Sequence, residues 1–172
     1  MELRDAIASL RRTPESLSKQ LDGLSDAQLR FNPEGGYFSA LENICHLRDI
    51  EIEGYGVRLR RLLAEEHPAL PDINGGQLAG ERRYSEQPVH PALDTFTQAR
   101  HGNLKILGSV TGTQLARTGF LESTDEITLG GLLELWVEHD RGHIQELEKL
   151  RTAIRELHVP QKTTPSLPLG RP

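Results

Sequence analysis

The stretch Trp136-Val-Glu-His139-Asp-Arg-Gly-His143-Ile-Gln-Glu-Leu147 carries two histidines four residues apart. On an α-helix this spacing places both imidazoles on one face, one turn apart, where they can bind the same metal ion. Apolar residues recur around them at helical spacing, and both histidines fall in step with this apolar stripe. The stripe consists of Leu129, Leu132, Trp136, Leu147, Leu150 and Ile154. The pattern predicts a helix from about Thr128 to about Leu157, with both histidines on its buried face.

A buried imidazole nitrogen needs a polar partner, because leaving it unpaired costs about 1–3 kcal/mol. Backbone carbonyls or waters are one possible set of partners for His139 and His143, and a shared metal ion is the other. A third ligand from another part of the chain would favour the metal.

Length and composition favour a single cytoplasmic domain. A chain of 172 residues can bury a sizeable core, and its single cysteine, Cys45, excludes an internal disulfide. The amino terminus has no apolar run typical of a signal peptide, and no stretch approaches the roughly 20 apolar residues that span a bilayer. The net charge is −5 with acidic and basic residues interleaved. We therefore expect neither a nucleic acid nor a membrane as a partner.

Two amphipathic segments occupy the first half of the chain. From Glu2 to about Asp22 apolar residues follow one helical stripe, and Pro14 inside it predicts a bent or restarted helix. Ser25 to Gly36 reads as a connection with a possible single helical turn at residues 26–30 and a breaker cluster at residues 32–36. Ser39-Ala-Leu-Glu42 is a capping box, so a second helix should run from about Ala40 to about Glu65. We expect its buried face to include Leu41, Ile44, Cys45, Ile52, Tyr55, Leu59 and Leu62.

The second half contains two more amphipathic segments and a long connection. Residues 66–91 are rich in Pro, Gly and polar residues, which predicts an irregular crossover along the second helix that starts the third helix parallel to it. A third helix is marked by Leu93, Phe96, Arg100, Leu104, Leu107 and Val110. Arg100 lies at or next to the core, where a guanidinium requires a carboxylate partner. Residues 158–172 contain four prolines and should form an extended or disordered tail, with a docking segment as the alternative.

Four long amphipathic segments and no convincing strand predict an all-α fold, a four-helix bundle with a long crossover between helices 2 and 3. The bundle should occupy residues 1–157 and the tail residues 158–172.

His46 is the candidate third ligand. It lies well inside the second helix, with Asp49 and Glu53 one and two turns along on the same side. The other histidines fall in loops, at helix ends or beside polar neighbours, where a solvated ring is expected; they are His67, His90, His101 and His158. Three histidines from two helices would leave at least one coordination position open, as in a catalytic site.

These residues resemble the DinB superfamily, the DinB/YfiT-like metal-dependent enzymes. In the first half the resemblance rests on residues 10–14, residues 24–29, and the segment from Ser39 through Glu42-Asn-Ile-Cys-His46-Leu-Arg-Asp49. In the second half it rests on residues 68–71, residues 93–100, and His139-Asp-Arg-Gly-His143 with Leu147. The linked pattern covers most of the chain, although each piece alone is weakly specific.

The resemblance implies a four-helix bundle, commonly a homodimer, in which three histidines hold a divalent metal. Carried over by position, these ligands are His46, His139 and His143. It also implies metal-dependent chemistry with a low-molecular-weight thiol, and zinc or nickel as the metal. The sequence departs from the family pattern at Tyr37-Phe38, where tryptophan is common, and at Glu146, where glutamine is frequent.

Other residues near the site have two interpretations. Asp49 is the candidate catalytic residue, able to orient His46 or accept a proton, and its alternative is an ordinary solvated helix carboxylate or a partner for Arg48. Glu138 and Asp140 flank His139 and point about 100° to either side of it, so surface positions are expected for both, with hydrogen bonds to the metal ligands as the alternative. Cys45 should be a buried, inert thiol that faces away from His46. Trp136 and Tyr55 should pack in the core, with a substrate wall as the alternative.

The leading hypothesis is a metal-dependent thiol S-transferase or hydrolase, in which a metal-activated thiol or water attacks a small electrophile. The alternative is a non-catalytic metal-binding or ligand-binding bundle that acts through its dimer surface. An open coordination position facing a pocket would favour the enzyme.

Overall fold

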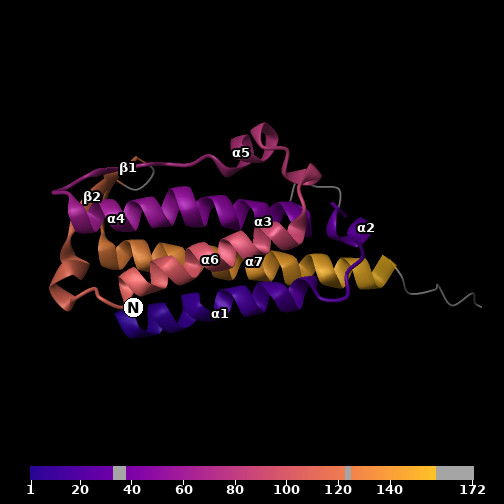
Figure 1. Cartoon of the computed structure of the whole chain (residues 1–172), viewed down its shortest axis with the longest axis horizontal. Coiled ribbons are helices and arrows are strands. Elements are labelled where there is room, and N and C mark those ends of the chain that lie inside the picture. The colour runs from indigo at the N-terminus through magenta and orange to yellow at the C-terminus, as the bar shows by residue number, and fades with distance from the viewer. Residues whose placement is uncertain (33–37, 123–124, 158–172) are drawn as a thin grey trace, which may run out of the picture.

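Four long helical rods lie side by side in the structure, a computed structural model that describes residues 1–32, 38–122 and 125–157 (Figure 1). The rods are α1 (Leu3–Leu21), the continuous run α3 (Ala40–Asp49), η1 (Ile50–Tyr55) and α4 (Gly56–Ala64), then α6 (Val89–Leu107) and α7 (Leu129–Leu157). The predicted four-helix bundle is therefore confirmed. The short helix α2 (Asp26–Leu29), capped by Ser25, is the predicted single turn after the first rod.

The rods run in two parallel pairs. Helices α1 and α7 are parallel, because contacting residues rise in number on both: Met1 contacts Glu134, and Thr13 contacts Asp140. Helix α6 and the rod α3–η1–α4 are parallel for the same reason: Glu51 contacts Arg100, and Arg60 contacts Asn103. By contrast, α3 runs antiparallel to α7. The two helices pack against each other, and His46 of α3 contacts His139 of α7.

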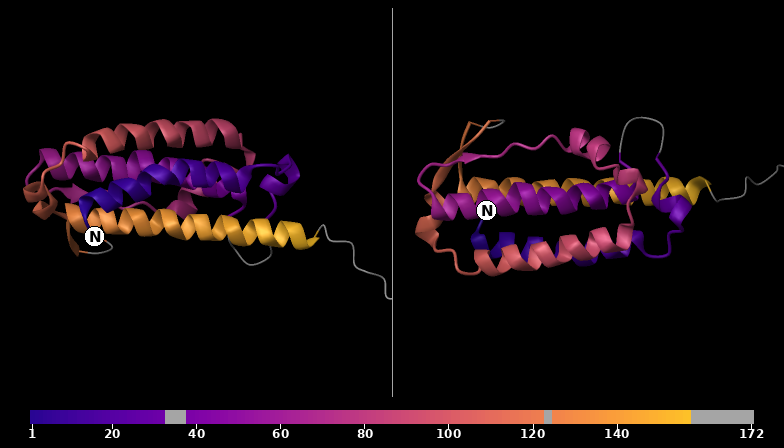
Figure 2. Two further views of the ribbon diagram at one scale, coloured as in Figure 1. Left: turned by 90° about the horizontal axis from the view of Figure 1, so that it is seen from below. Right: turned by 45° about the horizontal axis from the view of Figure 1, so that its top comes forward.

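The crossover runs along the outside of α3–η1–α4 and returns the chain to the end where α3 begins (Figures 1 and 2). It contains β1 (Ala69–Leu70), α5 (Gly75–Glu81) and the 3₁₀ turn η2 (Tyr84–Glu86). The expectation of a purely irregular segment was wrong, because the Asn74 side chain caps α5 by accepting a hydrogen bond from the Gln77 amide at 3.0 Å. The sequence does not predict α5, because its first two residues are glycines, which have a low helix propensity.

A small sheet closes the end of the bundle where α4 ends and α7 begins (Figure 1). It has the order β1-β2-β3, in which β2 (Thr118–Leu121) pairs parallel with β1 and antiparallel with β3 (Asp125–Thr128). The expectation of no strand was wrong, because strands of two to four residues are too short for alternation to be visible. The 3₁₀ turn η3 (Gly112–Ala116) links α6 to this sheet.

A π-helical turn interrupts the second rod at residues 50–55. The wider turn shifts the phase of the helix, so Glu51 is buried at 1% exposure and Ile52 is exposed at 39%. The predicted burial of Ile52 was therefore wrong, because it assumed one unbroken α-helical period. The other six residues predicted for this buried face are all buried.

Pro14 lies inside a single helix, α1, so the alternative of a restarted helix was wrong. Proline has no N–H to donate to the carbonyl four residues earlier, which here belongs to Leu10. That carbonyl instead accepts a hydrogen bond from Arg100 Nη1 at 2.9 Å. The backbone group that Pro14 leaves free is thus paired with a buried cation.

Helix ends follow the local signals. Ser39 and Glu42 form the expected capping box, and α7 spans Leu129–Leu157, within one residue of expectation.

The proposed tail at residues 158–172 and most of the breaker cluster lie outside the described residues. Within the described part of the chain, no helix is long and apolar enough to cross a membrane.

The apolar core is divided along the bundle into two clusters. One cluster surrounds Leu59 and Trp136 at the sheet end, and the other surrounds Ile44 and Phe96 at the opposite end. Several of the buried polar side chains lie in the segments between the two clusters and form a polar layer, which includes Thr13, His46, Asp49, Glu51, Arg100, Asn103 and Asp140. The candidate site belongs to this polar layer.

Candidate metal centre

Three histidines from two facing helices converge in the polar layer. His46 comes from α3, and His139 and His143 come from adjacent turns of α7. The candidate ligand nitrogens of the three rings all lie within 4.8 Å of one another, and His46 Nε2 is 3.2 Å from His139 Nε2. The structure thus brings together all three residues that sequence reasoning selected.

The separation of the His46 and His139 nitrogens fits a single metal ion. Two nitrogens bound to one tetrahedral cation at about 2.0–2.1 Å are about 3.3–3.4 Å apart, close to the observed separation of His46 and His139. Backbone carbonyls of the described residues, the alternative partners considered for buried imidazoles, do not accept hydrogen bonds from these two rings. Nδ1 of His46 and Nδ1 of His139 are buried without a hydrogen-bond partner in the described part of the chain. Neutral imidazoles are a donor set suited to zinc, nickel and other divalent transition metals.

His143 is oriented by groups that surround its Nδ1 atom. Asn43 donates from Nδ2 to the carbonyls of Phe38 and Ser39, both at 3.2 Å, which fixes its amide with Oδ1 turned outward. His143 Nδ1 lies 2.6 Å from this oxygen and 3.2 Å from Glu146 Oε2. A proton on Nδ1 satisfies both acceptors and leaves the lone pair of Nε2 free for a metal.

Electrostatics keep the rings of His46 and His139 neutral. Burial, followed by the neighbouring His143, lowers the pKa of His46 to about 4. Burial, followed by the two other histidines, lowers the pKa of His139 to about 2. Glu146 has a lowered pKa because it is hydrogen-bonded to His143. At pH 7 the rings of His46 and His139 therefore carry the lone pairs that a metal requires.

Asp49, the candidate catalytic residue, is held by three donors. Arg48 Nε donates to Oδ1 at 2.7 Å, the Tyr84 hydroxyl donates to Oδ2 at 2.7 Å, and Arg82 Nη1 lies 2.8 Å from Oδ2. The pairing of Asp49 with Arg48 is therefore confirmed, whereas the alternative of a solvated carboxylate was wrong, because Asp49 is only 3% exposed. A catalytic role for Asp49 stays a prediction, and Glu53 shares Arg82 with it.

Asp140 is buried at 3% exposure, so the expectation of a surface position was wrong. It accepts hydrogen bonds from Thr13 Oγ1 at 2.7 Å and from Arg100 Nη1 at 2.6 Å. Sequence reasoning missed this because it considered only the angle from His139, whereas α1 and α6 cover the other side of α7. Glu138 is exposed, as expected, and pairs with Arg141.

Arg100 is fully buried and has the expected carboxylate partners. Its guanidinium bonds to Asp140 and, at 2.8 Å, to Glu51 Oε2. Glu51 also accepts hydrogen bonds from Trp136 Nε1 at 3.1 Å and from Asn103 Nδ2 at 2.8 Å. The network joins all four rods, and its member Asp140 follows His139 in the chain.

The remaining expectations concern packing. Cys45 is fully buried and lies 3.7 Å from Gln87 Oε1, and burial raises its pKa to about 11, which is typical of an inert thiol. Tyr55 stacks on Trp136 with ring centroids 4.8 Å apart, and its ring also lies 5.6 Å from His139. Both aromatic residues are buried in the core, as expected.

The other histidines lie away from the centre. His67 is exposed and contacts Thr118 Oγ1 at 3.0 Å. His90 and His101 are exposed on α6, and His158 lies outside the described residues.

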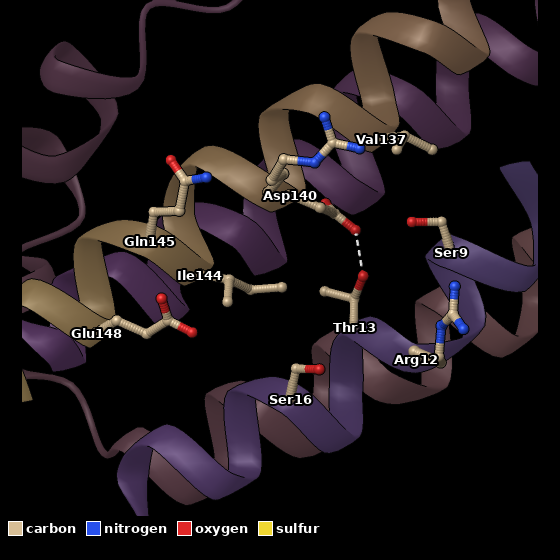
Figure 3. A pocket seen from close by; sticks show the side chains of 10 residues that line it. Ser9, Arg12, Thr13, Ser16, Val137, Asp140, Ile144, Gln145 and Glu148 are labelled. Atoms are coloured by element: carbon tan, nitrogen blue, oxygen red, sulfur yellow. Dashed lines mark hydrogen bonds between the residues drawn. The ribbon is translucent and has the colours of Figure 1, made fainter. Parts of the chain in front are cut away.

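A polar groove lies on the opposite side of α7, between α7 and α1 (Figure 3). Its volume is about 320 Å³, and Thr13 and Asp140 meet at its wall through their hydrogen bond. Its lining residues are Ser9, Arg12, Thr13, Ser16, Val137, Asp140, Arg141, Ile144, Gln145 and Glu148. Because none of these is a member of the histidine triad, the groove is separate from the candidate centre.

Comparison with known proteins places the chain in a family. The model of the DinB superfamily matches residues 9–147, which include all three histidines. The chain belongs to the DinB superfamily. DinB membership thus agrees with the resemblance that the sequence motifs suggested.

Two relatives of this DinB chain carry names that mention a metal. A Bacillus subtilis (strain 168) protein named "Putative metal-dependent hydrolase YfiT" is 28% identical over 156 residues, which cover 84% of this chain and 81% of the relative. A Geobacillus thermodenitrificans (strain NG80-2) protein named "Putative metal-dependent hydrolase" is 23% identical over 151 residues, covering 87% of this chain and 84% of the relative.

The fold is also similar to a solved structure. The YfiT structure from Bacillus subtilis, whose title describes an unusual four-helix bundle topology, superimposes with a TM-score of 0.83 at 22% identity. The match covers 90% of this chain and 88% of that one. The chain thus shares the overall fold of that structure.

Proposed function

We propose that this protein is a divalent-metal-dependent hydrolase whose metal is held by His46, His139 and His143. The observation that carries the proposal is the convergence of three imidazole nitrogens within 4.8 Å of one another from helices far apart in the sequence. The names of the two relatives support the same reaction class.

Three protein ligands leave at least one coordination position for a reactant, which distinguishes catalytic from structural sites. A divalent cation bound by neutral imidazoles keeps its full charge and lowers the pKa of a coordinated water or thiol towards neutrality. The residues contribute orientation: Asn43 and Glu146 hold His143 in one tautomer, and Tyr55 packs against His139. Asp49 remains the proposed group for proton transfer; it makes no hydrogen bond to His46, whose Nδ1 atom has no partner among the described residues.

Finer features of the proposal follow from the family resemblance. Zinc or nickel is the expected metal, and a low-molecular-weight thiol is the expected alternative to water as the nucleophile. A homodimer and a small-molecule electrophile as substrate also stay predictions.

Metal content tests the centre. Purified protein should contain about one zinc or nickel ion per chain by elemental analysis, or take up one after dialysis against these ions. His139→Ala should lose it, while His101→Ala, which changes an exposed histidine of α6, should retain it. A parent protein that binds no divalent ion under either condition would contradict the proposal.

Reaction class is tested on the metal-loaded protein. An activated ester and a haloaromatic electrophile would each be offered with and without a small thiol. Metal-dependent ester cleavage without thiol supports the hydrolase, whereas thioether formation only with thiol supports the transferase. Metal binding with turnover in neither assay would favour the non-catalytic alternative.

A further inference from the structure

The crossover touches the candidate centre at one glycine, Gly75. This residue begins α5, which packs on α3, the helix that carries His46. A Cβ atom built on Gly75 would lie 2.4 Å from Cε1 and 2.6 Å from Nδ1 of His46. Both separations are far below van der Waals contact, so the backbone of the crossover lies directly against the His46 ring.

Close approach, not backbone conformation, requires glycine here. Gly75 does not have the positive φ angle that disfavours other residues. Alanine could therefore adopt the same backbone, and it has a higher helix propensity than glycine. The one obstacle at this position is the imidazole of His46.

The His46 ring also lacks the hydrogen bond that usually fixes a metal ligand. Metal-bound histidines generally donate from their second nitrogen to a carboxylate or carbonyl. Within the described part of the chain, Nδ1 of His46 is buried without such a partner. Its surroundings are instead packing contacts, with the Phe38 ring at a centroid distance of 5.4 Å and Gly75 against Nδ1 and Cε1.

We propose that Gly75 is a positioning residue that holds the His46 ring sterically, so that its Nε2 atom faces the histidines of α7. This inference rests on the proposed metal centre and adds a function for the crossover. The crossover connects α4 to α6, and its residue Gly75 also packs against the ring of His46 and limits the orientations that this ring can adopt.

Two other glycines of α5 provide matched controls. A Cβ on Gly76 would meet Asn74 Oδ1 at an ordinary 3.5 Å, and a Cβ on Gly80 would meet nothing within 4 Å. Gly75→Ala, Gly76→Ala and Gly80→Ala therefore make the same chemical change in one short helix. They differ in whether the added methyl group meets His46.

Metal affinity gives the first readout. Zinc would be titrated into the metal-free parent and the three variants in competition with a chromophoric chelator. We expect Gly75→Ala to bind zinc about 10- to 100-fold more weakly, the usual effect of losing a group that orients a ligand. Gly76→Ala and Gly80→Ala should bind within about twofold of the parent. Equal binding by Gly75→Ala, or equal loss in all three, would overturn the proposal.

A metal-free readout separates this inference from the proposed function. In the metal-free parent, the α protons of Gly75 and the Hε1 proton of His46 should give a nuclear Overhauser cross-peak. Its absence would overturn the positioning role, even if Gly75→Ala fails to fold. If the cross-peak is present but the parent binds no metal, the proposed function fails while the contact between Gly75 and His46 stands.

Discussion

Asn43 contacts His143 from within the buried face of α3, three residues before His46. Its side-chain amide is fixed by two backbone carbonyls, so its oxygen is held 2.6 Å from His143 Nδ1. A buried asparagine between Leu41 and Ile44 was a signal that sequence reasoning could have used. Its role becomes clear only when α7 is placed opposite.

Replacing Asn43 should lower the affinity for zinc while changing the melting temperature of the metal-free protein only slightly. Asn43→Leu removes the acceptor for His143, so the ring can rotate or change tautomer, and we expect zinc affinity to fall about 10- to 100-fold. Asn43→Asp keeps an acceptor oxygen and should recover much of the affinity. Chelator competition measures both, with thermal unfolding of the metal-free proteins as the control. Parent-like affinity in Asn43→Leu would contradict this role.

Asp49 should contribute to stability in a pH-dependent way. Burial would raise its pKa, but the hydrogen bonds from Arg48 and Tyr84 and the charge of Arg48 outweigh burial and lower it. A carboxyl whose pKa is lowered on folding stabilises the protein above its unfolded pKa, and that contribution is lost as the pH falls through the folded value.

Asp49→Asn should therefore be destabilised relative to the parent at pH 7, and the difference should narrow as the pH falls below about 4, the unfolded pKa of an aspartate, towards the lower pKa of the folded carboxyl. Urea unfolding across this range measures the effect. A difference that is constant with pH would show that the charge of Asp49 is not what stabilises the fold.

At the scale of elements, the bundle is joined by one buried ionic network. Arg100 on α6 bonds to Glu51 on η1, to Asp140 on α7 and to the carbonyl of Leu10 on α1. The π-helical turn places Glu51 in this network, and Pro14 frees the Leu10 carbonyl for it. Two local departures from ideal helix geometry thus serve one tertiary contact.

Arg100→Met should lower the free energy of unfolding by about 3–5 kcal/mol, because two buried carboxylates lose their cation. Lys105→Met changes an exposed cation on the same helix and should shift stability by less than about 0.5 kcal/mol. Chemical denaturation of the metal-free proteins compares them. Similar losses in both variants would show that the network is not a major source of stability.

For the whole molecule, the metal would link α3 to α7 and thereby stabilise the folded state. Free zinc at about 100 times its dissociation constant should add about 2.7 kcal/mol, which corresponds to a rise of about 5–11 °C in melting temperature. A chelator should reverse the rise, and His139→Ala should not show it. His101→Ala should respond like the parent, and a rise in His139→Ala would place the metal elsewhere.

The sequence by itself determined the four helices, the Ser39 capping box, the burial of Cys45 and the selection of His46, His139 and His143. These features depend on hydrogen bonds and periodicity within one turn or one face of a helix, or on the spacing of motifs. Tertiary structure alone decided the short strands, the phase shift that turns Ile52 outward, the burial of Asp140 and the contact of Gly75 with His46. Each of these depends on packing between segments that are not neighbours in the chain, as the 127 residues between Thr13 and its partner Asp140 illustrate, and no local pattern encodes such a contact.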